Sequence, residues 1–300
     1  MAAYLLYVMI DLPAKYAPAS EGVKRRPKTV VFLAVEGECT EKDYFDGLME
    51  YMQEKNADYS YIIEVLRPLK KGDTGPRALL EILLRCQRIV SEGLLFEETR
   101  EILKTHYQLA DIKALLDNSS GCPKEEREKF NAALFTLDID LKYRRSLIQL
   151  GSNKNLDVFA VVCDRDCQNH PSWLLDRIEH VCVENGFGFY LSNPCFELWL
   201  LFHFEDVLHS RTAAERASLL RNKRKSNGTP AERLLARVAG HHKSISRKKF
   251  KDDYSGRINT AINNALQFSQ DTHHLMTGLG SNIPDLMKFL DVPMELSGAL

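Results

Sequence analysis

The chain has 300 residues, of which 44% are hydrophobic and 27% are charged, and this composition excludes wholesale disorder. The length suits one large domain or two smaller ones. The net charge is only −1, yet the stretch from Arg211 to Lys251 contains thirteen Lys and Arg residues against two Glu, a local charge of +11. The distribution therefore predicts a basic face on an otherwise acidic body.

The N-terminal sequence and the cysteines both indicate where in the cell the protein resides. The apolar run from Ala2 to Ile10 is shorter than the roughly 20 residues of a membrane helix, and it lacks the positive flank of a secretory signal. The seven cysteines form no CxxC pair, which favours reduced thiols. We expect a cytoplasmic protein with no membrane partner.

The first half of the chain begins with an irregular basic arm at residues 1–28. Apolar and β-branched runs then predict buried strands at 29–35 and 60–66. A helix is expected at 40–55, with Thr40 and Asp43 as its capping box, and another from 76 to about 90. Residues 91–150 look wholly helical, and we interpret them as an inserted element.

The second half of the chain resumes the alternation of strands and helices. Strands are predicted at 156–163 and 187–191, with a helix at 171–184 between them. Another helix is expected to begin at Pro194, capped by Asn193, and the chain looks helical from Glu205 onward. Trp173 and Trp199 are expected to be core anchors. The alternation predicts an α/β fold with a parallel sheet flanked by helices, an α/β domain at 29–204 and a mostly helical, basic C-terminal region at 205–300.

Acidic side chains follow two of the predicted strands at their carboxyl ends. Glu36 follows the first strand, and Asp164 and Asp166 follow the third. Ligands bind at this edge of an open parallel sheet, and neighbouring strands would bring the three carboxylates together. Close carboxylates repel unless a cation neutralises them, and hard oxygen ligands suit Mg²⁺ or Mn²⁺. The alternative is that these acids are ordinary cap and turn residues.

Glu197 is the one acid in an otherwise apolar helix that begins near Pro194. A buried carboxylate must be protonated, paired or bound to a cation. It could bind a metal at the active edge of the sheet, or form a salt bridge with an arginine.

Three segments of the chain resemble a known family. They are Val35–Phe45 (VEGECTEKDYF), Cys163–Asp166 (CDRD) and Ser192–Leu200 (SNPCFELWL). The first two resemble the Toprim fold of topoisomerases, primases and OLD-type nucleases. All three together resemble the RloB-like family of bacterial phage-defence proteins, although residues 91–150 are longer than the family's usual connection.

The resemblance implies a Toprim domain, dependence on a divalent metal and nuclease activity in abortive infection. Glu36 matches the general acid/base position, and Asp164 and Asp166 match the metal-ligand pair. Glu41 and Glu197 match acidic positions that could complete a second metal site, so the expected ligand set is Glu36, Glu41, Asp164, Asp166 and Glu197.

The basic stretch is expected to bind the phosphates of a nucleic acid substrate. Its two densest clusters supply the candidates Arg221, Lys223, Arg224 and Lys225, and Arg247, Lys248, Lys249 and Lys251. The alternative is a mobile, solvated loop that turns at Ser226–Pro230.

The sequence thus predicts a metal-dependent nuclease that acts on RNA of the tRNA type or on DNA. Two rivals stay open, a DNA-nicking enzyme and a non-catalytic metal-binding module of a defence complex. Restraint of such an enzyme by a partner such as an ATPase, or by formation of a homo-oligomer, is also left open.

Overall fold

The computed structural model describes residues 29–37, 39–56, 58–66, 75–92, 101, 104–105, 123–136, 157–166, 169–240 and 245–293. The predicted basic arm and most of the predicted insertion at 91–150 lie outside these residues, although helix α5 (Lys124–Thr136) falls within the insertion. Two compact units can be separated: residues 31–87 with 158–300, and residues 1–30 with 88–157. The sheet and the candidate site belong to the first unit.

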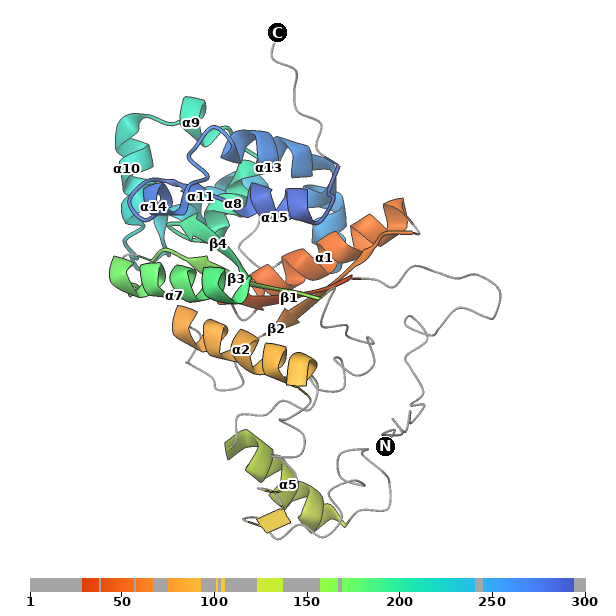
Figure 1. The fold of residues 1–300 in the computed structure, drawn as a ribbon. Helices are drawn as coiled ribbons and strands as arrows, with labels where there is room; N and C mark the ends of the chain where they lie inside the picture. Colours follow the sequence, from red (N-terminus) through yellow and green to blue (C-terminus); the bar gives the residue numbers. More distant parts are fainter. Residues whose placement is uncertain are drawn as a thin grey trace. The chain divides into compact units, whose positions relative to one another are not determined.

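Five strands form one mostly parallel sheet in the order β2-β1-β3-β4-β5 (Figure 1). They are β1 (Thr29–Val35), β2 (Tyr61–Leu66), β3 (Val158–Asp164), β4 (Gly188–Asn193) and β5 (Gly280–Ser281). β3 lies between β1 and β4 and is parallel to both, whereas β5 is antiparallel to β4. The predicted α/β fold class is confirmed.

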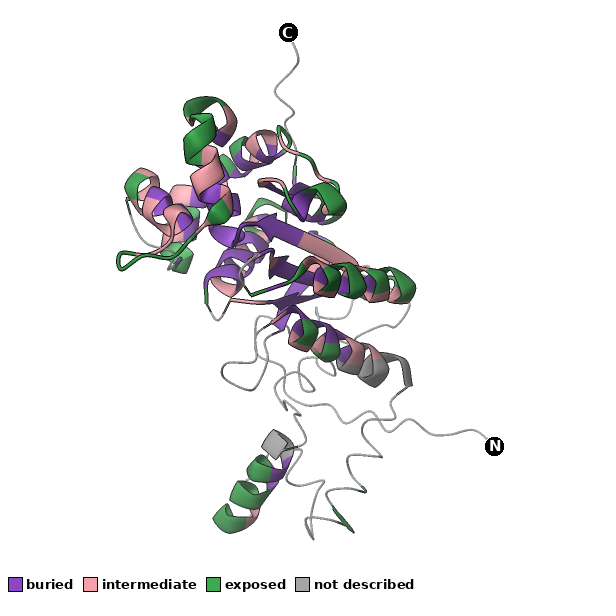
Figure 2. Cartoon of the chain, turned by 90° about the vertical axis from the view of Figure 1, so that its left-hand side faces the viewer, coloured by how far each residue is buried: buried purple, intermediate pink, exposed green. Residues whose placement is uncertain are grey.

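Alternate residues of β1 pack on opposite faces of the sheet, as the pleat requires. Val31, Leu33 and Val35 belong to the large core beneath α1 and the C-terminal helices. Phe32 stacks instead on Phe159 of β3, with ring centroids 5.1 Å apart. Since both faces are covered, β1 is buried from Val30 to Val35, and Figure 2 shows most of the sheet in the colour of buried residues.

Helices cover the two faces of the sheet in separate sets (Figure 1). On one face lie α2 (Pro76–Glu92) and α7 (Ser172–Asn185). On the other lie α1 (Thr40–Lys55), α8 (Phe196–Phe202), α13 (Ile258–Ala265) and α15 (Ile283–Phe289). None of the described helices is both long and apolar enough to cross a membrane.

The C-terminal region is a series of short helices. Besides α13 and α15 it contains α9 (Val207–Ser210), α10 (Ala213–Arg221), α11 (Pro230–Ala239), α12 (Arg247–Lys249), a π-helical turn (Phe250–Tyr254), a 3₁₀ turn (Ser255–Arg257) and α14 (Thr272–Leu275). Buried residues of this region, such as Leu235 and Leu286, share one core with β1 and α1. The helices therefore form one packed body with the sheet.

The prediction of a mostly helical C-terminal region is confirmed, and β5 adds one short strand to it. Two local predictions are wrong. The N-cap of α1 is Cys39, so Thr40 is already helical and forms no capping box with Asp43. Trp173 is not a core anchor, since it is 66% exposed, whereas Trp199 is fully buried.

Candidate active site at the carboxyl ends of β1 and β3

β1 and β3 are neighbours, and their pairing brings the predicted acids together. Val35 lies opposite Val162, so both strands reach the same edge of the sheet, with β2 on one side and β3 on the other side of β1. This edge is the switch point at which open α/β sheets bind ligands. The backbone N–H of Asp164 donates to the carboxylate of Glu36, with N and Oε2 3.1 Å apart.

Gly37 allows the carboxylate of Glu41 to reach this edge. A Cβ atom at position 37 would lie 1.7 Å from Oε2 of Glu41, so no side chain fits there while Glu41 keeps its place. Instead the backbone N–H of Gly37 donates to Oε1 of Glu41 at 3.1 Å. Glu41 is itself buried, in the first turn of α1. Because Gly37 has no side chain, the carboxylate of Glu41 can lie close to its backbone.

Asp164 and Asp166 are held by different groups. Oδ1 of Asp164 accepts from the backbone N–H of Phe196, the first residue of α8, at 2.8 Å. Asp166 has a left-handed backbone with φ of 23°, and its Oδ2 accepts from the side chain of Asn169 at 2.6 Å. The side chain of Arg165, between them, is buried and donates to the backbone carbonyl of Met276 at 2.7 Å.

His170 joins the site, although the sequence analysis did not identify it. Its Nδ1 lies 3.1 Å from the carbonyl oxygen of Asp164, and its Nε2 lies 3.4 Å from Oε1 of Glu36. A carbonyl only accepts, so Nδ1 carries a hydrogen and Nε2 faces the carboxyl group. Both oxygens of Glu36 are therefore held by groups from the end of β3. The sequence could have indicated His170, because it is a titratable residue a few positions after Asp164 and Asp166.

The electrostatics of the site disfavour ionisation of its carboxyl groups. Burial raises the pKa of Glu36 to about 8, assisted by the negative charges of Glu41 and Asp166 and opposed by the hydrogen bond from Asp164. Burial likewise raises the pKa of Asp164 well above its usual range, and the charges of Glu36, Glu41 and Glu197 add to this effect. Carboxylates in such a cluster ionise readily only when a cation accompanies them.

Glu197 reaches the same place from α8. The residues of this helix are all buried, and its N-cap is Cys195. The prediction that Asn193 caps the helix and Pro194 begins it is wrong, because Asn193 ends β4 and donates from its side chain to the backbone carbonyl of Leu275 at 2.6 Å. The β-strand simply runs further than its apolar pattern indicated.

A pocket of about 350 Å³ opens at this edge and joins acidic with basic side chains. Asp164, Asp166 and Glu197 line it together with Arg221 and Arg224. The remaining lining residues are Asn169, Pro194, Cys195, Asn222, Thr229 and Glu232. The pocket thus combines carboxyl groups and guanidinium groups within one cavity.

The loop between α10 and α11, which carries the first basic cluster, is anchored to the site. Asn222 ends α10 in a left-handed conformation, and its Nδ2 lies 3.3 Å from Sγ of Cys195. Its Oδ1 accepts from the backbone N–H of Ala231 at 3.1 Å. Lys225 and Gly228 exchange two backbone hydrogen bonds of 3.1 Å, so the chain turns within Ser226–Pro230, although Pro230 itself already begins α11. Lys223 and Lys225 are exposed on this loop.

The second basic cluster lies elsewhere on the fold. Arg247 pairs with Glu50 at 3.1 Å, and Lys251 pairs with Glu54 at 2.9 Å. Both acids belong to the last turns of α1, about 15–21 Å along the helix from Thr40 at the site. None of Arg247, Lys248, Lys249 and Lys251 lines the pocket. The structure therefore separates the two clusters that the sequence analysis grouped together.

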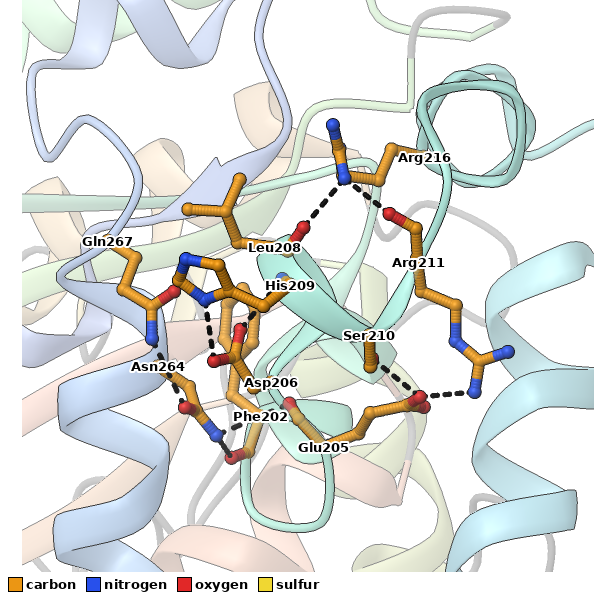
Figure 3. A network of polar contacts seen from close by, with 10 residues as sticks. All are labelled: Phe202, Glu205, Asp206, Leu208, His209, Ser210, Arg211, Arg216, Asn264 and Gln267. Atoms are coloured by element: carbon orange, nitrogen blue, oxygen red, sulfur yellow. Dashed lines mark hydrogen bonds and ion pairs between the residues drawn. The ribbon is translucent and has the colours of Figure 1, made fainter.

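A polar network fixes the chain between α8 and α10 (Figure 3). Oε1 of Glu205 accepts from Oγ of Ser210 at 2.8 Å and forms an ion pair with Arg211. From α13, Asn264 donates to the backbone carbonyls of Phe202 and Glu205 at 2.8 and 3.2 Å. The network holds the start of α10, whose last residue lines the pocket.

The donor set suits a hard divalent cation. All the acidic candidates offer carboxylate oxygens, which Mg²⁺ and Mn²⁺ prefer. Among the described residues, the only three potential metal ligands within 4.8 Å of one another are Asp176, Glu179 and His273, none of which lines this pocket. The carboxylates of the candidate site are not among them.

Fold and site together define an α/β protein with an acidic cluster at the switch point of a mostly parallel sheet. The chain belongs to the RloB-like protein family, whose family model matches residues 31–290. The match confirms the family resemblance found in the sequence. No curated protein and no solved structure matches the chain significantly.

Proposed function

We propose that the protein is a nuclease that depends on Mg²⁺ or Mn²⁺ and hydrolyses phosphodiester bonds, with RNA of the tRNA type as the expected substrate in abortive infection. One observation carries the proposal: acids from the ends of β1 and β3 meet at one edge of the sheet, and three acids there, Asp164, Asp166 and Glu197, line a pocket with two arginines. The raised pKa values of Glu36 and Asp164 favour a cation there.

In this proposal each group of residues has a separate task. Asp164 and Asp166 would hold the metal ion, with Glu41 and Glu197 available for a second one. When bound, the metal supplies positive charge that stabilises the phosphate in the transition state. Arg221 and Arg224 would hold phosphate oxygens from the other wall of the pocket, since a guanidinium matches phosphate geometry.

Glu36 would transfer a proton or bind a second ion. Its pKa of about 8 lies near neutral pH, where a general acid or base is most effective. His170 and the backbone N–H of Asp164 hold its two oxygens, so the group is oriented before a substrate arrives. An acid held in this way can deliver its proton to one fixed position.

Cleavage assays with a matched control test the proposal. Purified wild-type protein, Asp164→Asn and Asp176→Asn are incubated with Mg²⁺ or Mn²⁺ and with tRNA, single-stranded RNA or plasmid DNA. Asp176 serves as the control because it belongs to the acidic cluster outside the pocket. We expect Asp164→Asn to lose activity by orders of magnitude and Asp176→Asn to keep it.

Each outcome separates the proposal from its rivals. Equal background cleavage by the wild type and Asp164→Asn would contradict the assignment of the site. Cleavage of plasmid but not RNA would favour the DNA-nicking alternative. Metal binding without turnover on any substrate would favour a non-catalytic module. An active nuclease would need restraint in the cytoplasm, by a partner such as an ATPase or by self-association.

A further inference from the structure

Trp173 is the most exposed aromatic side chain among the described residues, with 66% of its surface accessible. It lies in the first turn of α7, whose N-cap is Pro171. Because α7 follows the parallel strand β3, its first turn lies at the same edge of the sheet as Asp164. The ring is therefore exposed to solvent on the turn of α7 that lies at this edge of the sheet.

The position of Trp173 is fixed relative to the acidic residues. The side chain of Arg165, between the two aspartates, donates to Oγ of Ser172 at 2.8 Å and to the backbone carbonyl of His170. Asn169, which lines the pocket, is four residues before Trp173, so their Cα atoms are at most about 14 Å apart. Trp173 thus stands on a segment that Arg165 holds in place, a short stretch of chain away from a residue that lines the pocket.

The surroundings of Trp173 indicate what it binds. One turn along α7, Asp176 and Arg177 are exposed and charged. The other large exposed apolar residue of this helix, Val183, is ten residues away, about 15 Å along the axis. A protein interface needs an apolar patch around its central aromatic residue, whereas a nucleobase can stack on a single exposed ring when basic groups nearby hold the backbone of the strand.

We infer that Trp173 is a stacking platform for an unpaired base of a single-stranded nucleic acid. The inference rests on the proposed function for one point, that the pocket holds a phosphate of the same strand. The strand then runs from the pocket over the start of α7, and its flanking base lies on the indole ring. A base inside a duplex has no free face, so the surface selects single strands or unpaired loops.

Intrinsic fluorescence tests the inference directly, because the chain has two tryptophans and the other, Trp199, is fully buried. The full-length wild type, Trp173→Phe and Trp173→Ala are titrated with a single-stranded RNA oligonucleotide and with a blunt duplex of equal length. A chelator is present, so no cleavage occurs. Anisotropy of a dye on the RNA gives the affinity independently, and melting temperatures show that the variants fold.

We expect the single strand to quench the tryptophan emission of the wild type and the duplex to quench it far less. Trp173→Phe should keep most of the affinity without a change in emission, and Trp173→Ala should bind the single strand about tenfold more weakly. Stacking on an aromatic ring accounts for an effect of this size. If the protein gives these binding results but cleaves no substrate, the nuclease proposal is wrong and the inference about Trp173 still holds.

Three results would overturn the inference: unchanged affinity in Trp173→Ala, equal quenching by duplex and single strand, or no binding of either RNA by the wild type. Emission that changes with protein concentration alone would also overturn it, since Trp173 would then contact a second copy of the chain. If Trp173→Ala binds RNA as tightly as the wild type while cleavage depends on Asp164, the inference about Trp173 is wrong and the proposed function still holds.

Discussion

Replacing Glu36 by Gln should stabilise the metal-free protein, although Glu36 lies in the proposed catalytic centre. A glutamine keeps the shape and both hydrogen bonds of the site. Its carbonyl oxygen accepts from the backbone N–H of Asp164, and its amide donates toward Nε2 of His170. What the variant removes is a group that is buried and difficult to ionise.

The pKa of Glu36 sets the size of the effect. The carboxyl group has a pKa of 4.5 in the unfolded chain and about 8 in the folded one, so between these values the native state binds a proton that the unfolded state has released. The stability from this group is complete below pH 4.5 and is lost as the pH rises to about 8. At about 1.4 kcal/mol per pKa unit, the loss is about 3 kcal/mol at pH 7 and about 5 kcal/mol above pH 8.

Urea unfolding of the wild type and Glu36→Gln, with a chelator and at several pH values, measures this difference. The two proteins should be similar near pH 4.5, and the advantage of Glu36→Gln should grow by a few kcal/mol up to pH 8. Addition of Mn²⁺ should reduce the advantage, because the ion accompanies the ionised Glu36. A difference that does not vary with pH, or a less stable variant at pH 8, would refute the reasoning.

Two further predictions concern the basic loop and the aromatic core. Neutralising Lys223, Arg224 and Lys225 together should reduce the slope of log K against log salt for binding of single-stranded RNA by roughly 2. The control variant, Arg247→Gln with Lys251→Gln, should leave the slope unchanged. Equal slopes for the two variants would show that the loop does not bind phosphates. Burial lowers the pKa of His203 to about 3, so its protonation favours the unfolded chain as the pH falls below about 6.5. Because of this residue, the free energy of unfolding of the wild type should fall by about 2 kcal/mol between pH 7 and pH 5. Urea unfolding at both pH values should show no such decrease for His203→Gln.

The strands and the acids that follow them were predictable because their signals are local. Each buried strand is a continuous apolar run, and the predicted ends agree with the structure to within two residues at β1, β2, β3 and β4. The sequence could place acids at the ends of two strands, but these acids lie close together only because β1 and β3 are neighbours. Only the strand order of the structure shows that they are.

The features that could not be predicted depend on contacts between distant residues. His170 belongs to the site only because β1 brings Glu36 to its ring. The two basic clusters look alike in sequence, but one is anchored beside Cys195 and the other pairs with the far end of α1. The apolar character of Trp173 predicted burial, whereas the polar residues around it on α7 left it exposed. No local pattern distinguishes these cases.

Binding of Mn²⁺ is the most direct test of the central claim, that the acids at the ends of β1 and β3 form a divalent-metal site. Electron paramagnetic resonance of free Mn²⁺ gives the affinity and number of sites for the wild type, Asp164→Asn and the control Asp176→Asn. The account predicts that Asp164→Asn loses a site that the wild type and Asp176→Asn retain. Unchanged Mn²⁺ binding in Asp164→Asn, or loss of the site in Asp176→Asn alone, would contradict it.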